Sequence, residues 1–176
     1  MKTVIFAATA AACIALSAPA FAQDQSTPFT GAHIEGLAGY DAVKTNSNGL
    51  GTPGGFLYGV GLGYDLRAGG AIVGLEGELS DSTASRAGID AARDLYVGAR
   101  VGVPVSKNVL AYVKAGYSNA RIEGAGLDQN GSGVRVGAGL EYDLGNKLFA
   151  KTEYRYTNYE QDVERHQVLG GVGIRF

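Results

Sequence analysis

The chain has 176 residues, a usual length for one domain, and carries 15 Lys or Arg against 17 Asp or Glu, a net charge of −2. Glycine is frequent at 28 residues, only 18% of residues are charged, and there are 10 Tyr and 1 Cys. This composition excludes a collagen repeat, a disulfide or zinc framework and plain disorder, and its charge argues against a nucleic-acid partner.

The first 22 residues have the three parts of an export signal. A basic residue precedes an apolar stretch over 4–16, and Ala20 and Ala22 form a small-x-small cleavage site. We therefore expect a signal peptide at 1–22, cleaved before Gln23, and not a retained membrane anchor. The single Cys lies inside this segment, so the exported chain would have no disulfide.

Strict two-residue alternation begins after a short segment at 23–28. It is clearest over 56–66, where large apolar side chains occupy one face and mainly glycines the other. A helix would scatter both sets around its circumference, so this pattern predicts a β-strand. Seven further segments alternate in the same way: 31–43, 71–81, 94–103, 109–118, 133–144, 148–157 and 166–176.

The connections between these eight strands alternate in length. Those expected to be long are 44–54, 82–92, 120–131 and 158–165, and those expected to be short are 67–70, 104–108 and 145–147. The short ones carry turn residues, namely Gly69-Gly70, Pro104 and Gly145-Asn146. Strands of about 9–11 residues with long loops at one end and short turns at the other are typical of outer-membrane barrels.

The polar face of the strands is rich in glycine and in charges of both signs. An eight-stranded barrel leaves an interior just wide enough for side chains, and paired charges beside glycines suit such a lumen. We therefore predict a mutually neutralising lumen network, because an unpaired charge there would cost several kcal/mol. Its members are Glu35, Glu76, Glu78, Arg100, Lys114, Arg135, Glu141, Lys151, Glu153, Arg155 and Arg175.

Aromatic residues of the apolar face lie near the strand ends, which predicts two girdles at the membrane interfaces. They are Tyr40, Phe56, Tyr58, Tyr117 and Tyr156 at the long-loop end, and Tyr64, Tyr142 and Phe176 at the other. A soluble lipocalin-like barrel with this face turned inward is the rival interpretation, since alternation alone does not fix which face is outside.

The last residues, Val172-Gly-Ile174-Arg-Phe176, look like the C-terminal signal read by the bacterial barrel assembly machinery. Residues 29–176 resemble the small eight-stranded outer-membrane family that includes the opacity proteins and the membrane domain of outer membrane protein A. The resemblance implies an all-β, eight-stranded, antiparallel up-and-down transmembrane barrel. It also implies a location in the outer membrane of a Gram-negative bacterium, among lipid and lipopolysaccharide, with both termini periplasmic.

The sequence favours a structural or surface-interaction role, in envelope integrity or adhesion, for a monomer whose loops contact an extracellular ligand. The alternative is a small porin-like channel for ions or solutes. A lipid-modifying enzyme is less favoured. Outer-membrane deacylases of similar size have a His two residues before the Ser, whereas Gly116 lies two residues before Ser118, and nothing in the sequence predicts a base beside a nucleophile. His33 and His166 alone are weak metal ligands, so no metal or cofactor is predicted.

Overall fold

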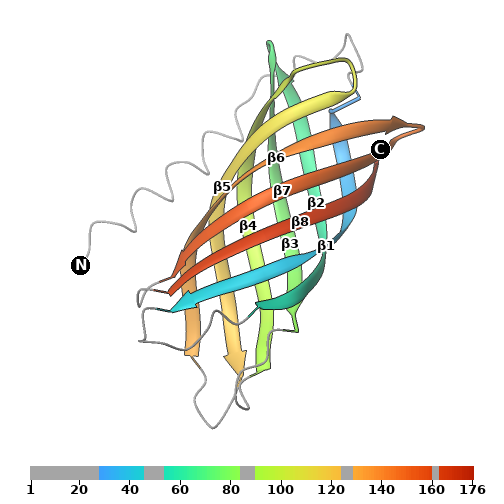
Figure 1. Ribbon diagram of the computed structural model, residues 1–176. Helices are drawn as coiled ribbons and strands as arrows, with labels where there is room; N and C mark the ends of the chain where they lie inside the picture. Colours follow the sequence, from blue (N-terminus) through green and yellow to red (C-terminus); the bar gives the residue numbers. More distant parts are fainter. Residues whose placement is uncertain (1–27, 46–53, 84–89, 124–128, 160–162) are drawn as a thin grey trace, which may run out of the picture.

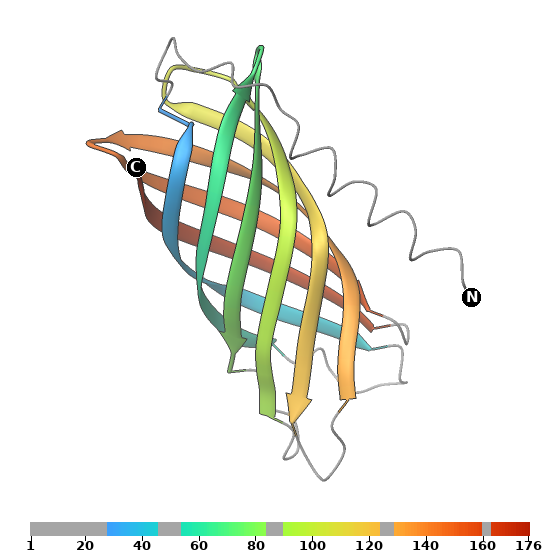
Figure 2. The ribbon, with the colours of Figure 1, turned by 180° about the vertical axis from the view of Figure 1, so that it is seen from behind.

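The computed structural model describes residues 28–45, 54–83, 90–123, 129–159 and 163–176 as a closed antiparallel barrel of eight strands (Figures 1 and 2). The fold class predicted from the sequence is confirmed. The strands are β1 (Gly31–Thr45), β2 (Gly54–Ala68), β3 (Ala71–Ser82), β4 (Asp90–Pro104), β5 (Val109–Glu123), β6 (Gln129–Gly145), β7 (Leu148–Tyr159) and β8 (Val163–Arg175). The predicted signal peptide and its cleavage site lie outside the described residues.

Each strand pairs with its neighbours in the sequence, and β1 closes the barrel against β8. The closing register pairs His33 with Arg175 at one end and Thr45 with Val163 at the other. The amide of Phe176 extends this seam by donating to the carbonyl of Ala32 over 2.8 Å. Closure leaves no unpaired sheet edge, which is the condition for strands to cross hydrocarbon.

The strands are longer than the sequence predicted, between 12 and 17 residues. The 120–131 loop was placed wrongly at its edges, because Arg121 pairs with Asn130 and Ile122 with Gln129. Antiparallel pairing uses backbone groups, so it continues past the point where apolar alternation stops. The sequence pattern therefore marked only the alternating part of each strand.

One end of the barrel carries three tight connections and is called here the turn end. Gly69 and Gly145 adopt φ values of +63° and +80°, which an L side chain would resist, and Asn146 and Lys147 also have positive φ. Pro104 ends β4 instead of lying in the turn, which is closed by the amide of Val105 donating to Val109 O over 2.9 Å. The opposite end, where the longer connections begin, is the loop end.

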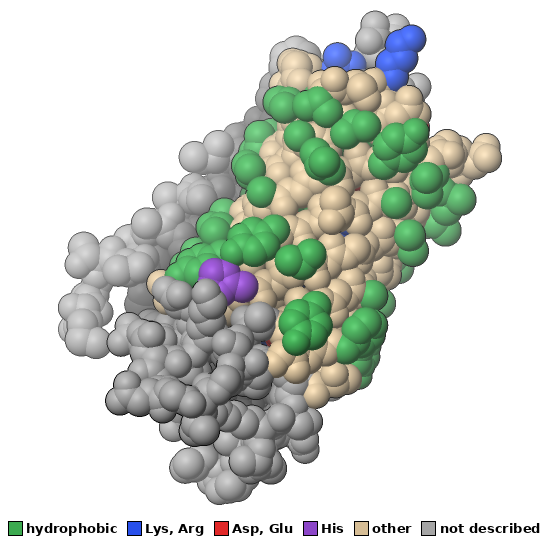
Figure 3. Space-filling view, viewed as in Figure 1, with side chains coloured by type: hydrophobic (Ala, Val, Ile, Leu, Met, Phe, Trp, Pro, Cys, Tyr) green, Lys and Arg blue, Asp and Glu red, His purple; other side chains and the backbone are tan. Residues whose placement is uncertain are grey.

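The outer wall of the barrel is apolar. Leu62, Val97 and Val172 are each more than 60% exposed, and hydrophobic side chains cover much of the wall in Figure 3. Lys and Arg gather in that view at the turn end, away from the wall. Among the described residues, no helix is long and apolar enough to span a membrane.

The side chains predicted to form aromatic girdles lie on this outer wall. Tyr156 alone is half-buried, with its ring centroid 5.2 Å from that of His166. The other seven are between 48% and 70% exposed: Tyr40, Phe56, Tyr58, Tyr64, Tyr117, Tyr142 and Phe176. Val172 and Ile174 of the C-terminal motif also face outward.

Candidate functional site: a charge network that fills the lumen

The inward face of all eight strands carries charged side chains that are withdrawn from solvent. The structure buries every residue predicted for the lumen network, and none is more than 5% exposed. They fall into three clusters along the barrel axis, which are described here from the turn end to the loop end. A buried charge needs a partner, so the pairing within each cluster decides whether the lumen is stable.

The turn-end cluster consists of His33, Asp65, Arg100, Glu141 and Arg175. Arg100 bridges the two carboxylates, with its Nη2 2.5 Å from Asp65 and its Nη1 3.1 Å from Glu141. Arg175 bridges the same two at 2.7 and 2.6 Å. His33 Nδ1 lies 3.2 Å from Asp65. Two guanidinium groups therefore clamp two carboxylates in a closed square, drawn from β2, β4, β6 and β8.

The middle cluster is centred on Lys114, which crosses the lumen from β5. Its ammonium lies 2.7 to 2.8 Å from three carboxylates, those of Glu76, Glu78 and Glu153. Arg155 also donates to Glu78, over 2.7 Å, and to Glu153. One cation thus serves three anions, and two of these anions share a second cation.

The middle cluster extends to the closing seam through Lys151 of β7. Lys151 donates to Glu35 of β1 over 2.5 Å and lies 3.6 Å from Glu153. Lys151 and Glu35 are 116 residues apart in the chain. The ion pair spans β8, which lies between the two strands, so it forms only once the barrel is closed.

The loop-end cluster consists of Asp41, Asp94, Arg135, Arg165 and Ser118. Arg135 and Ser118 both donate to Asp94, and Arg135 Nη2 also donates to Ser118 over 3.0 Å. Arg165 binds Asp41 and lies 3.3 Å from Asp94, and its side chain is 12% exposed. This cluster is the last of the three toward the loop end.

Four Asp or Arg members of these clusters were missing from the predicted network, and so were His33 and Ser118. Asp41 and Asp65 lie in the alternating segments predicted at 31–43 and 56–66 but not in the predicted network, and Arg165 lies in the predicted loop 158–165. Asp94 begins the predicted segment 94–103 and is likewise absent from the network. The two-residue alternation places Asp94 on the same face as Arg100, because it lies six residues before Arg100 on the same strand. With them, eight carboxylates face seven Lys or Arg side chains and His33 among the described residues of the lumen.

Two tyrosine rings connect the charged clusters. Tyr96 lies with its ring centroid 4.7 Å from Lys114 Nζ and 5.2 Å from Arg135 Cζ, and so joins the middle and loop-end clusters. Tyr112 lies 5.2 Å from Arg100 and donates its hydroxyl to Glu153 over 2.7 Å. These contacts place cations over ring faces, where the ring quadrupole attracts them. The polarity of the lumen is therefore continuous from one end to the other.

An apolar cluster seals the turn end. Phe29, two residues before β1, is 1% exposed and packs with Ile72 and Leu110. The guanidinium of Arg175 donates to the carbonyl of Phe29 over 3.0 Å and so fixes this segment to the turn-end cluster. A second apolar cluster lines the lumen on the closing side and contains Leu37, Leu57 and Leu169.

Glycines on the inward face make room for these side chains. A Cβ on Gly116 would clash with the backbone of Val97 and Gly98, and one on Gly98 with the ring of Tyr96. The ring of Tyr96 thus occupies the space over Gly98 of its own strand and over Gly116 of the neighbouring β5. The two His residues are separate: His33 lies in the turn-end cluster, while His166 is half-buried on the outer wall and bonds to Tyr154 over 2.6 Å. Within the described ranges, no group of three or more His, Cys, Asp or Glu could hold a metal ion.

Comparison with known proteins agrees with this architecture. The 25 kDa outer-membrane immunogenic protein of Brucella ovis is 29% identical over 146 residues, covering 78% of this chain and 72% of that protein. The same protein of Brucella abortus matches over 66% of its length, so the chain spans about two thirds of these curated relatives.

Solved structures share the fold at lower identity. Neisserial surface protein A (NspA) superposes with a TM-score of 0.61 at 19% identity, covering 84% of this chain and 98% of that one. The attachment invasion locus protein Ail of Yersinia pestis gives 0.58 at 20%, covering 83% and 99%. The outer membrane enzyme PagL gives 0.51 at 13%, covering 82% and 99%. The fold therefore does not by itself separate enzymes from other surface proteins.

The family model for the outer membrane protein beta-barrel domain matches residues 8–176, nearly the whole chain. The apolar wall is thus the lipid-facing surface, and the charged face is the lumen. The chain belongs to this family and is a small β-barrel protein of the Gram-negative outer membrane.

Proposed function

We propose that this protein is a structural barrel of the outer membrane that holds its loops at the cell surface and does not conduct. The observation that carries the proposal is the continuity of the lumen network. Charged, aromatic and apolar side chains succeed one another along the axis, from Phe29 at the turn end to Arg165 at the loop end. Envelope integrity or surface contact is the role that such a closed scaffold supports.

The middle cluster is the main barrier to an ion path. A permeating ion would have to displace Lys114 from three carboxylates or Arg155 from two. Breaking a buried ion pair leaves an uncompensated charge and costs about 3–5 kcal/mol. Several pairs would have to open together, so we expect passage to be rare on the timescale of a channel recording.

An enzymatic role finds no support among the described side chains. Ser118 is bonded to Asp94 and Arg135, not to a His that could act as a base. His33 contacts Asp65 and Phe149 inside the lumen, and His166 contacts two tyrosines on the outer wall. Nucleophilic catalysis needs a base within hydrogen-bond reach of the nucleophile, and these positions do not provide one.

The proposal includes export and surface contact as well as closure. We expect the chain to be cleaved before Gln23 and inserted by the barrel assembly machinery, which reads the motif ending at Phe176. In the membrane it is then a monomer among lipid and lipopolysaccharide. An extracellular ligand would meet the connections at the loop end. Deleting residues 46–53 should lower attachment of cells to a surface, and unchanged attachment would contradict the surface-contact part.

The closed lumen is tested by single-channel recording of the refolded protein in planar bilayers, with a porin reconstituted in parallel as positive control. We expect no stable unitary conductance from the wild type. Lys114→Ala, which removes the cation shared by Glu76, Glu78 and Glu153 in the middle cluster, should produce brief openings. A stable wild-type conductance that Lys114→Ala abolishes would instead establish the porin-like channel.

A further inference from the structure

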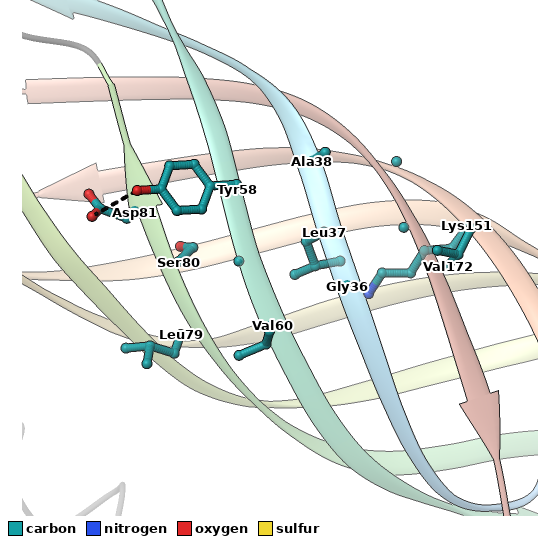
Figure 4. A pocket seen from close by; sticks show the side chains of 13 residues that line it. Gly36, Leu37, Ala38, Tyr58, Val60, Leu79, Ser80, Asp81, Lys151 and Val172 are labelled. Atoms are coloured by element: carbon teal, nitrogen blue, oxygen red, sulfur yellow. Dashed lines mark hydrogen bonds between the residues drawn. The ribbon is translucent and has the colours of Figure 1, made fainter.

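A hollow of about 790 Å³ lies in the outer wall where β8, β1, β2 and β3 adjoin (Figure 4). Its floor is made of small outward-facing residues, Gly36 and Ala38 of β1 and Gly170 of β8. Apolar side chains border it, among them Val60, Leu79 and Val172. Residues whose side chains point into the lumen also line it, among them Leu37, Ser80 and Lys151, so the hollow is a depression where few outward side chains cover the lipid-facing wall.

The two glycines of the floor are not required by the fold. A Cβ on Gly36 would meet nothing within 4 Å, and one on Gly170 only the carbonyl of Lys151 at 3.6 Å. Neither has positive φ, and the lumen glycine Gly116, in contrast, leaves no space for a Cβ. Glycine within a strand costs stability, and it often marks a place where another molecule approaches the backbone. The missing side chains of Gly36 and Gly170 therefore leave space on the outside of the barrel.

The hollow has a polar end on the loop side. There the hydroxyl of Tyr58 donates to Asp81 over 3.4 Å, and Tyr58 lies beside Ala38 in the β1–β2 register. Gly36 pairs with Val60, one outward-facing row further from the loops. The depression thus runs from the aromatic level of the wall toward its middle. A lipid in the outer leaflet has the same orientation, with its polar group at the aromatic girdle and its chain pointing inward.

We propose that this hollow binds one acyl chain of an outer-leaflet lipid, with Tyr58 and Asp81 at the boundary of its polar group. The hollow is continuous with the lipid-facing belt, so the occupant enters sideways from the bilayer. In a membrane, contact is driven by van der Waals packing and not by hydrophobicity, because both surfaces are apolar. A chain lying on Gly36 and Gly170 gains packing against backbone atoms, which larger outward-facing side chains would cover.

The test is native mass spectrometry of the full chain in detergent with added lipid A, the acylated anchor of lipopolysaccharide. The wild type should retain one lipid after detergent removal. Gly36→Leu/Gly170→Leu fills the hollow and should weaken retention at least about tenfold, since several methylene contacts are lost. The matched control is Gly77→Leu, on the same outer wall but outside the hollow, where a Cβ meets only Tyr96 O at 3.8 Å. It should retain lipid like the wild type.

Heat-modifiable gel mobility verifies that each variant is folded, and Ala38→Leu provides a second filling variant from β1 alone. Equal retention by the wild type and a folded filling variant would overturn the proposal. So would equal loss in Gly77→Leu, which would indicate annular lipid without a site. A wild-type dimer that the double variant converts to monomers would show that a second copy covers the hollow, and would also refute the inference.

Discussion

Removing the ammonium of Lys114 is the sharpest test of the lumen network. Lys114→Met keeps most of the aliphatic stem of the side chain. It deletes the ammonium, which lies 4.7 Å from the ring centroid of Tyr96 and is shared by Glu76, Glu78 and Glu153. Glu78 and Glu153 retain Arg155, whereas in the part of the chain described here no other Lys or Arg lies within 4.0 Å of Glu76. One buried carboxylate is therefore left uncompensated, which costs about 3–5 kcal/mol.

Urea unfolding in lipid vesicles, followed by heat-modifiable gel mobility, measures this loss. Val113→Met, at the adjacent lipid-facing position that is 59% exposed, is the control and should change the free energy of unfolding little. Lys114→Met/Glu76→Gln removes the orphaned charge together with its partner, so it should regain most of the loss as a coupling energy of about 2 kcal/mol or more. A Lys114→Met cost below about 1 kcal/mol, or a double variant that only adds the two single costs, would refute the network as the basis of lumen stability.

Three further experiments, on five substitutions, test the lumen packing, the turn-end seal and the lipid-facing wall. Gly116→Ala places a Cβ against the backbone of the facing strand and should cost about 1–3 kcal/mol, whereas Gly77→Ala has free space; equal unfolding midpoints for the two would contradict this. Phe29→Ala removes the ring of the turn-end seal and should lower the free energy of unfolding by about 3 kcal/mol, and a loss under 1 kcal/mol would show that the seal is loose. Leu62→Arg in the middle of β2 should cost about 2–4 kcal/mol in vesicles and Leu144→Arg near the turn end about 0–1, and no difference would argue against the lipid-facing assignment.

Alternation in the sequence was sufficient to predict the fold and the orientation of most side chains. Glu76 and Glu78 oppose Val73 and Leu79 on β3, and the structure buries the two glutamates while Leu79 remains exposed. This worked because side-chain direction in a strand depends on parity alone, which is a local property. The family relationship then supplied what parity does not contain, namely which face meets lipid.

The partners of each charge could not be predicted in the same way. Which strands face one another across the lumen depends on the tilt and stagger of the closed barrel, and no single strand encodes these. Lys114 of β5 therefore contacts Glu76 and Glu78 of β3, and Lys151 of β7 contacts Glu35 of β1. Strand ends were missed for a related reason, since pairing outside the alternating segment is carried by the backbone.

The seam between β1 and β8 determines the order in which this molecule can form. It joins the first and last strands, and residues such as His33 and Arg175 come together across 142 positions of sequence. Pairing at such separation carries a large loop-closure cost and slows folding. Until β8 has paired with β1, Glu35 is not close to Lys151, and Asp65 has no contact with Arg175. The lumen charges thus make half-built intermediates unfavourable in hydrocarbon, so the chain should enter the bilayer as a nearly complete cylinder, in one late and cooperative step.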